Sequence, residues 1–405
     1  AGTHEVTVTD KLGYTTKCSV VIGQPQAPLT AAIDSKTDVN CKGDATGSAT
    51  ASATGGNGTY SYSWNTVPVQ TGATASNLIA GTYIVTVTDS KGCTDTETVI
   101  IDEPANALTA AIDSKTDVNC KGDATGSATA SATGGTAGYS YSWNTVPVQT
   151  GATASNLVAG TYIVTVTDSK GCTDTETVTI GEPSAVLSCS VVQNKAVTSN
   201  GLSDGEATVT PLGGNGGYTY LWDNNETTQK ALALSAGLHS VTVTDSKGCK
   251  TTCTVTITEP NVLSCSITQD DPAKCYGDNN GKATVVAIGG NGEYTYLWDN
   301  GETAAQATGL TAGTHEVTVT DKLGYTTKCS VVIGQPQAPL TAAIDSKTDV
   351  NCKGDATGSA TASATGGNGT YSYSWNTVPV QTGATASNLV AGTYIVTVTD
   401  SKGCT

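Results

Sequence analysis

The sequence has no phenylalanine, no methionine and little charge, and these absences exclude several classes of function. Charged residues make up 13% of the 405 positions, and the net charge is −16. Lys and Arg do not cluster, so the chain lacks the basic surface that binds nucleic acid or an anionic membrane. No apolar run reaches the roughly eighteen residues of a membrane span, so we expect no membrane insertion.

Catalytic and metal-binding patterns are also missing. The three histidines are His4, His239 and His315, and the first and last occupy the same position in two copies of one segment. No Ser-His-Asp order, paired-glutamate pattern or phosphate-binding loop occurs, so we expect no enzyme, no catalytic residue and no cofactor. Zinc sites favour Cys-x-x-Cys pairs, and the sequence has none, so we expect no metal ligands.

What the sequence does contain is one segment repeated along its whole length. Tyr60-Ser-Tyr-Ser-Trp64 is followed by Gly81-Thr-Tyr-Ile-Val-Thr-Val-Thr-Asp89, and both motifs recur. Successive tryptophans are spaced by 79, 79, 76 and 77. A nearly constant period of this size indicates an array of one small unit. These tryptophans are Trp64, Trp143, Trp222, Trp298 and Trp375.

Proline residues divide the array into modules. Each follows a strand-like segment, usually after Glu or Gln, and proline favours a stiff, extended connector. The boundary prolines are Pro25, Pro104, Pro183, Pro260 and Pro336. We therefore predict the C-terminal strands of a preceding module at 1–25, β-sandwich repeats at 26–104, 105–183, 184–260 and 261–336, and an incomplete repeat at 337–405.

Within 26–104 the pattern predicts short strands and no helix. Strands are expected at 29–33, 47–54, 60–64, 83–88 and 94–101, with one or two more inside 67–78. Short antiparallel strands separated by frequent turns are typical of an immunoglobulin-like sandwich. The predicted fold is all-β: a tandem array of small antiparallel β-sandwich modules forming an elongated filament, with disulfides inside the modules.

The single tryptophan of each module has two interpretations. The Tyr-x-Tyr-x-Trp strand could stack against a sugar, because aromatic faces suit pyranose rings. It could equally supply the largest buried area in a core made otherwise of small residues. We favour the core for all five tryptophans.

Four motifs in fixed order resemble a known family. They are Asn40-Cys-Lys-Gly-Asp44, Gly55-Gly-Asn-Gly-x-Tyr-x-Tyr-x-Trp64, Leu78-x-Ala-Gly-Thr82 and Val85-Thr-Val-Thr-Asp-Ser-Lys-Gly-Cys93. This combination is similar to the SprB-type repeat of giant cell-surface adhesins of gliding Bacteroidetes, and the likeness covers nearly the whole chain. It implies an extracellular filament on the cell surface, exported by type IX secretion, that grips a substratum. Ser199, Tyr14 and Tyr325 depart from the pattern, because each replaces an expected cysteine.

Recurring cysteine separations predict disulfides inside the modules. The separation is 52 in three pairs and 64 in two, and matching separations in separate copies favour bridges within each copy. We expect the two cysteines of each pair in the first set to lie at the same pole of a module. This usage indicates an oxidising, extracellular location. The predicted pairs are Cys41–Cys93, Cys120–Cys172, Cys352–Cys404, Cys189–Cys253 and Cys265–Cys329, with Cys249 and Cys275 left either to bridge neighbouring modules or as free thiols.

The predicted function is the repetitive stalk of a bacterial surface adhesin, with mechanical and binding roles in gliding and attachment. Its expected partners are a surface polysaccharide or substratum, and motility or secretion machinery bound through other regions. A self-assembling extracellular fibre is an alternative. A glycan- or calcium-binding array is another, since loop acids such as Asp44, Asp89, Asp123 and Asp168 could bind calcium, although a spaced ligand loop is missing.

Overall fold

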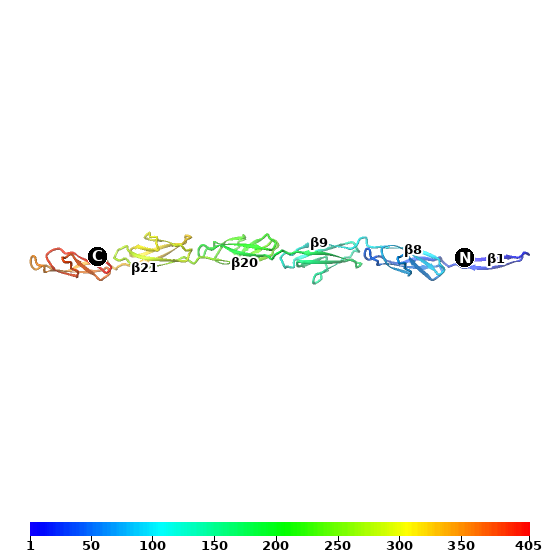
Figure 1. Ribbon diagram of the computed structural model, residues 1–405, viewed down its shortest axis with the longest axis horizontal. Coiled ribbons are helices and arrows are strands. Elements are labelled where there is room, and N and C mark those ends of the chain that lie inside the picture. Colours follow the sequence, from blue (N-terminus) through cyan, green and yellow to red (C-terminus); the bar gives the residue numbers. More distant parts are fainter. The chain divides into compact units, whose positions relative to one another are not determined.

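The computed structural model describes residues 1–405 and contains strands and turns without a helix (Figure 1). No helix long and apolar enough to cross a membrane is present. The chain divides into two compact units. One comprises 1–187, 212–217 and 245–249, and the other comprises 188–211, 218–244 and 250–405.

Strands follow one another in groups that recur with the sequence period. The hairpin β1 (Gly2–Thr9) and β2 (Thr15–Ile22) comes first. The first repeat comprises β3 (Thr30–Thr37), β4 (Gly47–Thr54), β5 (Tyr60–Trp64), β6 (Thr74–Leu78), β7 (Gly81–Asp89) and β8 (Thr94–Ile101). The second comprises β9 (Thr109–Thr116), β10 (Gly126–Thr133), β11 (Ser140–Trp143), β12 (Thr153–Leu157), β13 (Gly160–Thr167) and β14 (Thr173–Ile180).

The remaining groups have the same order. The third repeat comprises β15 (Ser188–Lys195), β16 (Gly205–Leu212), β17 (Thr219–Trp222), β18 (Lys230–Leu234), β19 (Gly237–Thr244) and β20 (Lys250–Ile257). The fourth comprises β21 (Ser264–Asp271), β22 (Gly281–Ile288), β23 (Thr295–Trp298), β24 (Gln306–Leu310), β25 (Gly313–Thr320) and β26 (Thr326–Ile333). The fifth comprises β27 (Thr341–Thr348), β28 (Gly358–Thr365), β29 (Ser372–Trp375), β30 (Thr385–Leu389) and β31 (Val396–Thr399).

Two small antiparallel sheets make up a complete repeat. In the second repeat the orders are β12-β10-β9 and β11-β13-β14, so every pairing is antiparallel. Register shifts bend the first sheet where β10 meets β9 and β12. The fold is therefore the all-β, immunoglobulin-like sandwich expected from the alternating pattern.

The core of each repeat lies between its sheets and is built around one tryptophan. All five tryptophans are 1% exposed. In the second repeat Trp143 packs with Val164, Val166 and Leu157, and its indole N–H donates to the Gly151 carbonyl at 3.0 Å. Because the neighbouring core residues are mostly Ala and Val, the indole supplies the largest share of the buried volume.

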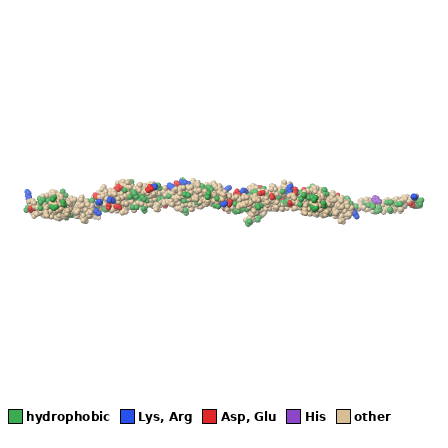
Figure 2. All heavy atoms as spheres, viewed as in Figure 1, with side chains coloured by type: hydrophobic (Ala, Val, Ile, Leu, Met, Phe, Trp, Pro, Cys, Tyr) green, Lys and Arg blue, Asp and Glu red, His purple; other side chains and the backbone are tan.

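Outward positions on the same strands carry threonine, serine and isolated charges. In β13 the residues alternate between buried valines and part-exposed threonines, so one face of the sheet is wet. Figure 2 shows lysine and acidic side chains interspersed over a surface that is otherwise mainly uncharged.

Most predicted strand positions agree with the structure, with one main difference. The first strand of 26–104 runs to Thr37 rather than ending at Ile33, because β3 continues past a bulge opposite β4. The segment 67–78 holds one strand, β6, in agreement with the one or two that were predicted. Before β6 the chain forms a loop, in which the Thr66 hydroxyl donates to the Pro68 carbonyl and accepts from the Gln70 N–H. The predicted module boundaries lie outside every strand. The extent of each module as a folding unit stays a prediction.

Candidate functional site: the joints between repeats

The residues with the most specific chemistry gather where one repeat meets the next. A loop follows the first strand of each repeat, and we call it the socket loop: 38–46, 117–125, 196–204, 272–280 and 349–357. From the second repeat onward, the turn that follows β13, β19, β25 or β31 approaches the socket loop of the preceding repeat. We call this turn, together with one residue of the Gly-Gly turn, the plug: 89–93, 168–172, 245–249, 321–325 and 400–404, with Asn57, Thr136, Asn215, Asn291 and Asn368.

The socket loop is held by the end of its own repeat. In the second repeat the Val118 N–H donates to the Gly181 carbonyl, and the Asn119 N–H donates to the Thr125 hydroxyl. The Gly122 N–H donates to Glu182 Oε2 at 2.9 Å. Gly122 has a φ of +87°, a conformation that glycine adopts without strain. These contacts fix the loop at the pole where the chain leaves the repeat.

Glu182 shows why Glu or Gln precedes the boundary proline: the side chain at this position holds the socket loop. The Lys121 ammonium lies 2.9 Å from its carboxylate. This ammonium first, and then the Gly122 N–H, lower the pKa of Glu182. The residue before the boundary proline accepts the same glycine N–H in the other complete repeats. Those contacts are Gly43 to Glu103, Gly201 to Glu259 and Gly277 to Gln335.

An aspartate organises each plug. Asp245 is 5% exposed and accepts the Lys247 and Cys249 N–H groups on one carboxylate oxygen. Its other oxygen accepts both the backbone and side-chain N–H groups of Asn215. Burial opposes ionisation of Asp245, but these hydrogen bonds outweigh it and lower the pKa of its carboxyl group.

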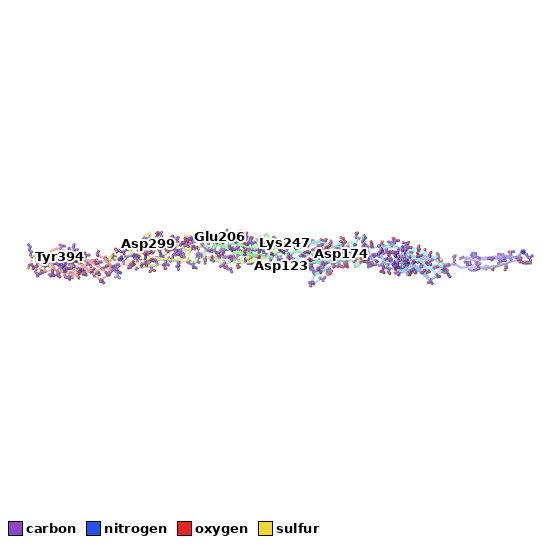
Figure 3. The ribbon with its side chains drawn as sticks, viewed as in Figure 1. Asp123, Asp174, Glu206, Lys247, Asp299 and Tyr394 are labelled. Atoms are coloured by element: carbon purple, nitrogen blue, oxygen red, sulfur yellow. A yellow bond between two sulfur atoms is a disulfide. The ribbon has the colours of Figure 1, made fainter.

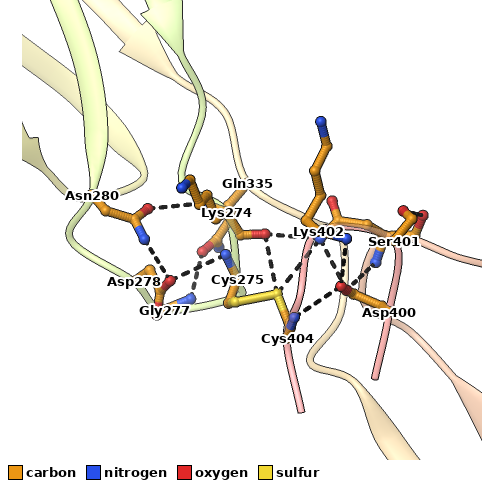
Figure 4. The surroundings of a disulfide bond; sticks show 11 residues. Lys274, Cys275, Gly277, Asp278, Asn280, Gln335, Asp400, Ser401, Lys402 and Cys404 are labelled. Atoms are coloured by element: carbon orange, nitrogen blue, oxygen red, sulfur yellow. Dashed lines mark hydrogen bonds between the residues drawn. A yellow bond between two sulfur atoms is a disulfide. The ribbon is translucent and has the colours of Figure 1, made fainter. Parts of the chain in front are cut away.

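Disulfides join plug to socket at three of the four joints. Cys41 is bonded to Cys172, Cys120 to Cys249 and Cys275 to Cys404, with Cα–Cα distances of 5.6, 5.7 and 5.7 Å. These distances lie in the ordinary range for a disulfide. Figure 4 shows the last of these bonds among the plug and socket residues around it.

An amide hydrogen bond accompanies the sulfur at two of these joints. Asn215 Nδ2 donates to the Asn119 carbonyl at 2.8 Å, and Asn368 Nδ2 donates to the Lys274 carbonyl at 2.8 Å. The same amide also donates to the plug aspartate, so one side chain links the plug and the neighbouring socket. Sequence reasoning missed these asparagines, although their position in Gly-Gly-Asn-Gly recurs along the chain.

The predicted pairings at a separation of 52 are wrong. Cys41 does not pair with Cys93, Cys120 does not pair with Cys172, and Cys352 does not pair with Cys404. Cys249 and Cys275 are both bonded, but not to each other, since their partners are Cys120 and Cys404. The free cysteines are Cys18, Cys93 and Cys352, all exposed.

Strand direction explains why these pairs cannot form. In the second repeat β9 and β14 run side by side in the same direction. The Ala110 N–H donates to Asp174 (labelled in Figure 3), and Lys115 donates to the Thr179 carbonyl further along. Cys120 follows the end of β9 and Cys172 precedes β14, so the two sulfurs lie at opposite poles. A strand of this length separates the poles by roughly 26 Å.

Two predicted pairs within repeats do occur. Cys189 is bonded to Cys253, and Cys265 to Cys329, each across a sequence separation of 64. They connect the start of the first strand to the middle of the last strand, which runs beside it. These bridges occur in the third and fourth repeats, which flank the one joint that lacks a disulfide.

The plug aspartates accept hydrogen bonds from backbone N–H groups of the turns in which they lie. Asp89 and Asp168 accept backbone N–H groups of the plug, and their carboxylates therefore stabilise the turn. No group of three or more His, Cys, Asp or Glu side chains is arranged to hold a metal ion. A calcium role for Asp44, Asp89, Asp123 or Asp168 stays a hypothesis.

Comparison with known proteins identifies the repeat. The family model described as "SprB repeat" matches residues 33–69, 112–148, 197–227, 268–303 and 344–380. Each match includes the socket loop of one repeat, except that the third begins one residue inside its loop. No curated protein matches the chain in sequence.

Several solved structures are similar at low identity. A tetra-tandem repeat from the extending region of a large adhesion protein is 14% identical, with 76% of this chain and 99% of that chain covered and a TM-score of 0.27. Invasin, a bacterial integrin-binding protein, is 13% identical over 82% of each chain, with a TM-score of 0.31. The eight N-terminal Ig domains of Down Syndrome Cell Adhesion Molecule are 13% identical, with 92% of this chain and 56% of that chain covered and a TM-score of 0.24. Scores this low carry no conclusion about this chain. The five family matches show that the chain carries five SprB repeats. Together with the five disulfides, they show a repetitive, adhesin-type region that lies outside the cell.

Proposed function

We propose that the chain is the repetitive stalk of a bacterial surface adhesin that serves gliding motility and attachment to a substratum. The observation that carries this proposal is the polarity of the repeat. A repeat has a socket at one pole and a plug at the other, so each copy can join the next. A repeat of this kind suits a function that depends on number, reach and resistance to tension.

The joint chemistry supports a role under load. The Cys120–Cys249 joint combines a disulfide with the hydrogen bond from Asn215 to Asn119. A covalent bond between neighbouring repeats prevents their separation as long as it stays oxidised, which fits an extracellular location. The acidic surface keeps neighbouring stalks apart by electrostatic repulsion at low ionic strength.

Export by type IX secretion and movement by surface motility machinery form part of the proposal. Both would act through regions other than these repeats. A surface polysaccharide or an abiotic substratum is the proposed ligand of the whole protein. The repeats themselves would place the binding region at a distance from the cell.

Antibody raised against the repeats tests the proposal on living cells. We expect it to label intact, unfixed cells, and beads coated with it to be carried along the cell surface. A mutant that lacks type IX secretion should retain the antigen inside the cell. Labelling only after lysis, in cells that still glide, would overturn the proposal.

A further inference from the structure

Three of the disulfides follow one another along the sequence without overlap and create short cuts through the chain. The first of them joins Cys41 to Cys172, and the second begins a short way further along the backbone, at Cys189. That bond ends at Cys253, which is followed closely by Cys275, the partner of Cys404. A bond between two repeats, a bond inside one repeat and another bond between repeats thus form a relay.

We propose that this relay is a covalent tension path that limits how far the protein can be stretched. The backbone between Cys41 and Cys404 includes nearly the whole chain. Through the three disulfides the shortest route follows only two stretches of backbone, 172–189 and 253–275. Unfolding of every repeat could not lengthen the protein beyond this shorter route. The limit follows from the disulfides alone and does not depend on the proposed adhesin function.

The shorter route has little slack in the folded state. From Cys172 it follows all of β14, and from Cys253 it follows the end of β20 and all of β21. The rise of a strand is roughly 3.2–3.4 Å per residue, whereas the backbone cannot exceed about 3.6 Å per residue. Tension along this route therefore meets backbone that is already largely extended. The tryptophan-bearing strands of the second, third and fourth repeats lie off it.

Magnitudes show how strong the limit is. The two backbone stretches of the relay amount to about 40 residues, which span at most about 140 Å when fully extended. The free backbone between Cys41 and Cys404 amounts to about 360 residues, which would span about 1,300 Å. Between these two cysteines a reduced and unfolded stalk could therefore reach roughly nine times the length of an oxidised one.

The Cys120–Cys249 bond, which also joins two repeats, is not part of the relay and has a different role. A route through it runs back along the backbone from Cys172 to Cys120, crosses the disulfide, and runs forward from Cys249 to Cys275. This route is about twice as long as the relay, so it carries tension only if the Cys189–Cys253 bond is broken. The topology therefore distinguishes a primary route from a reserve route.

Single-molecule stretching of the whole oxidised chain tests the inference. Handles are attached at Ala1 and Thr405, and the free thiols are blocked with N-ethylmaleimide. The shortest route between the handles runs from Ala1 to Cys41, through the relay, and from Cys404 to Thr405. It contains about 80 residues, whereas the reduced chain contributes all 405. We expect the maximal contour length to increase about fivefold after reduction.

Two double variants separate the relay from a general effect of disulfides. Cys189→Ser with Cys253→Ser removes a bond within one repeat and should lengthen the oxidised contour by about 140 Å, because the reserve route becomes the shortest. Cys120→Ser with Cys249→Ser removes a bond between repeats and should leave the contour unchanged. Peptide mapping without reductant verifies the remaining bonds in each variant.

Equal contour lengths for the oxidised and reduced wild-type chain would overturn the inference. So would a longer contour in the Cys120→Ser, Cys249→Ser variant whose other four bonds are intact. Neither readout uses a cell or a ligand, so failure of the adhesin proposal would be recognised separately by the antibody experiment.

Discussion

The hydroxyl groups of Thr198 and Tyr325 lie 2.8 Å apart at the joint between the third and fourth repeats. Asn291 Nδ2 also donates to the Thr198 carbonyl there, as the equivalent amide does at two other joints. Ser199 and Tyr325 occupy the positions where the other three joints have cysteines. Plug and socket therefore meet at this joint with hydrogen bonds and without a disulfide.

Cysteines at these two positions should form the missing bond. We expect Ser199→Cys with Tyr325→Cys to oxidise spontaneously, because the flanking residues form the same plug and socket as in the bonded joints. With the existing bridges intact, the new bond would close a loop through 189–199, 253–265 and 325–329. This loop has about 26 residues, and its closure stabilises by about 3.5 kcal/mol in the chain-entropy model. Non-reducing peptide mapping checks the bond, and hydrogen exchange of the joint residues checks the stabilisation.

The single variant Ser199→Cys is the matched control. It should show one additional reactive thiol and no new linked peptide. If the double variant keeps two free thiols under the same oxidising conditions, the plug and socket do not meet at this joint as described.

Thiol counting on the wild-type chain tests the pairing itself. We expect three of the thirteen cysteines, Cys18, Cys93 and Cys352, to react with an alkylating agent before reduction, and all thirteen afterwards. Proteolysis without reductant should release linked peptides containing Cys41 with Cys172 and Cys120 with Cys249. A linked peptide containing Cys41 and Cys93 would contradict the structure.

The repeat, the strands and the core could be predicted from the sequence because they depend on local pattern. Tyr60–Trp64 alternates aromatic and serine residues, so one face of this strand packs toward the core. This pattern does not depend on where the repeat lies in the array. Asp89-Ser-Lys-Gly has turn chemistry in every copy, so the last hairpin is fixed locally.

The joints could not be predicted in the same way, because a tandem array makes separations ambiguous. The separation of 52 recurs within repeats, but the separation of 129 or 131 between neighbouring repeats recurs just as faithfully. Spacing alone therefore cannot distinguish a bond inside one repeat from a bond to the next. The informative signal was that cysteine is missing at both Ser199 and Tyr325. These two residues lie in consecutive repeats, and cysteines there would form one pair between the repeats.

Truncation of a core tryptophan should destabilise one repeat. Trp298→Ala removes a side chain that is 1% exposed and whose indole N–H donates to the Ala304 carbonyl at 2.9 Å. Large aromatic truncations of this kind cost about 3–5 kcal/mol. Hydrogen exchange in β25 of the fourth repeat should accelerate by roughly 100-fold or more, since about 1.4 kcal/mol corresponds to a factor of ten.

Leu297→Ala provides the control in the same strand. Leu297 is 57% exposed on the opposite face, so its truncation should change exchange in β25 by less than about threefold. An equal effect of both variants would mean that Trp298 is not the centre of this core.

The plug aspartates should make the repeats sensitive to acid. Burial opposes ionisation of Asp400, but hydrogen bonds from the Asn368 backbone and side chain, and from the Cys404 and Lys402 N–H groups, outweigh it and lower the pKa of its carboxyl group to about 2. An aspartate in an unfolded chain has a pKa of about 3.9. As pH falls below about 4, the unfolded state takes up a proton while folded Asp400 stays ionised. This carboxylate therefore contributes full stability above about pH 4 and loses its contribution as pH falls through about 2.

Asp400→Asn should abolish that part of the acid response. Its amide cannot accept hydrogen bonds on both sides, so we expect the variant to be less stable than wild type at pH 6, and the difference to shrink progressively between pH 4 and pH 2. Hydrogen exchange of the fifth repeat, corrected for the intrinsic pH dependence of exchange, gives the stability at each pH. A difference between the two proteins that is as large at pH 2 as at pH 6 would show that the ionised carboxylate of Asp400 does not hold the plug.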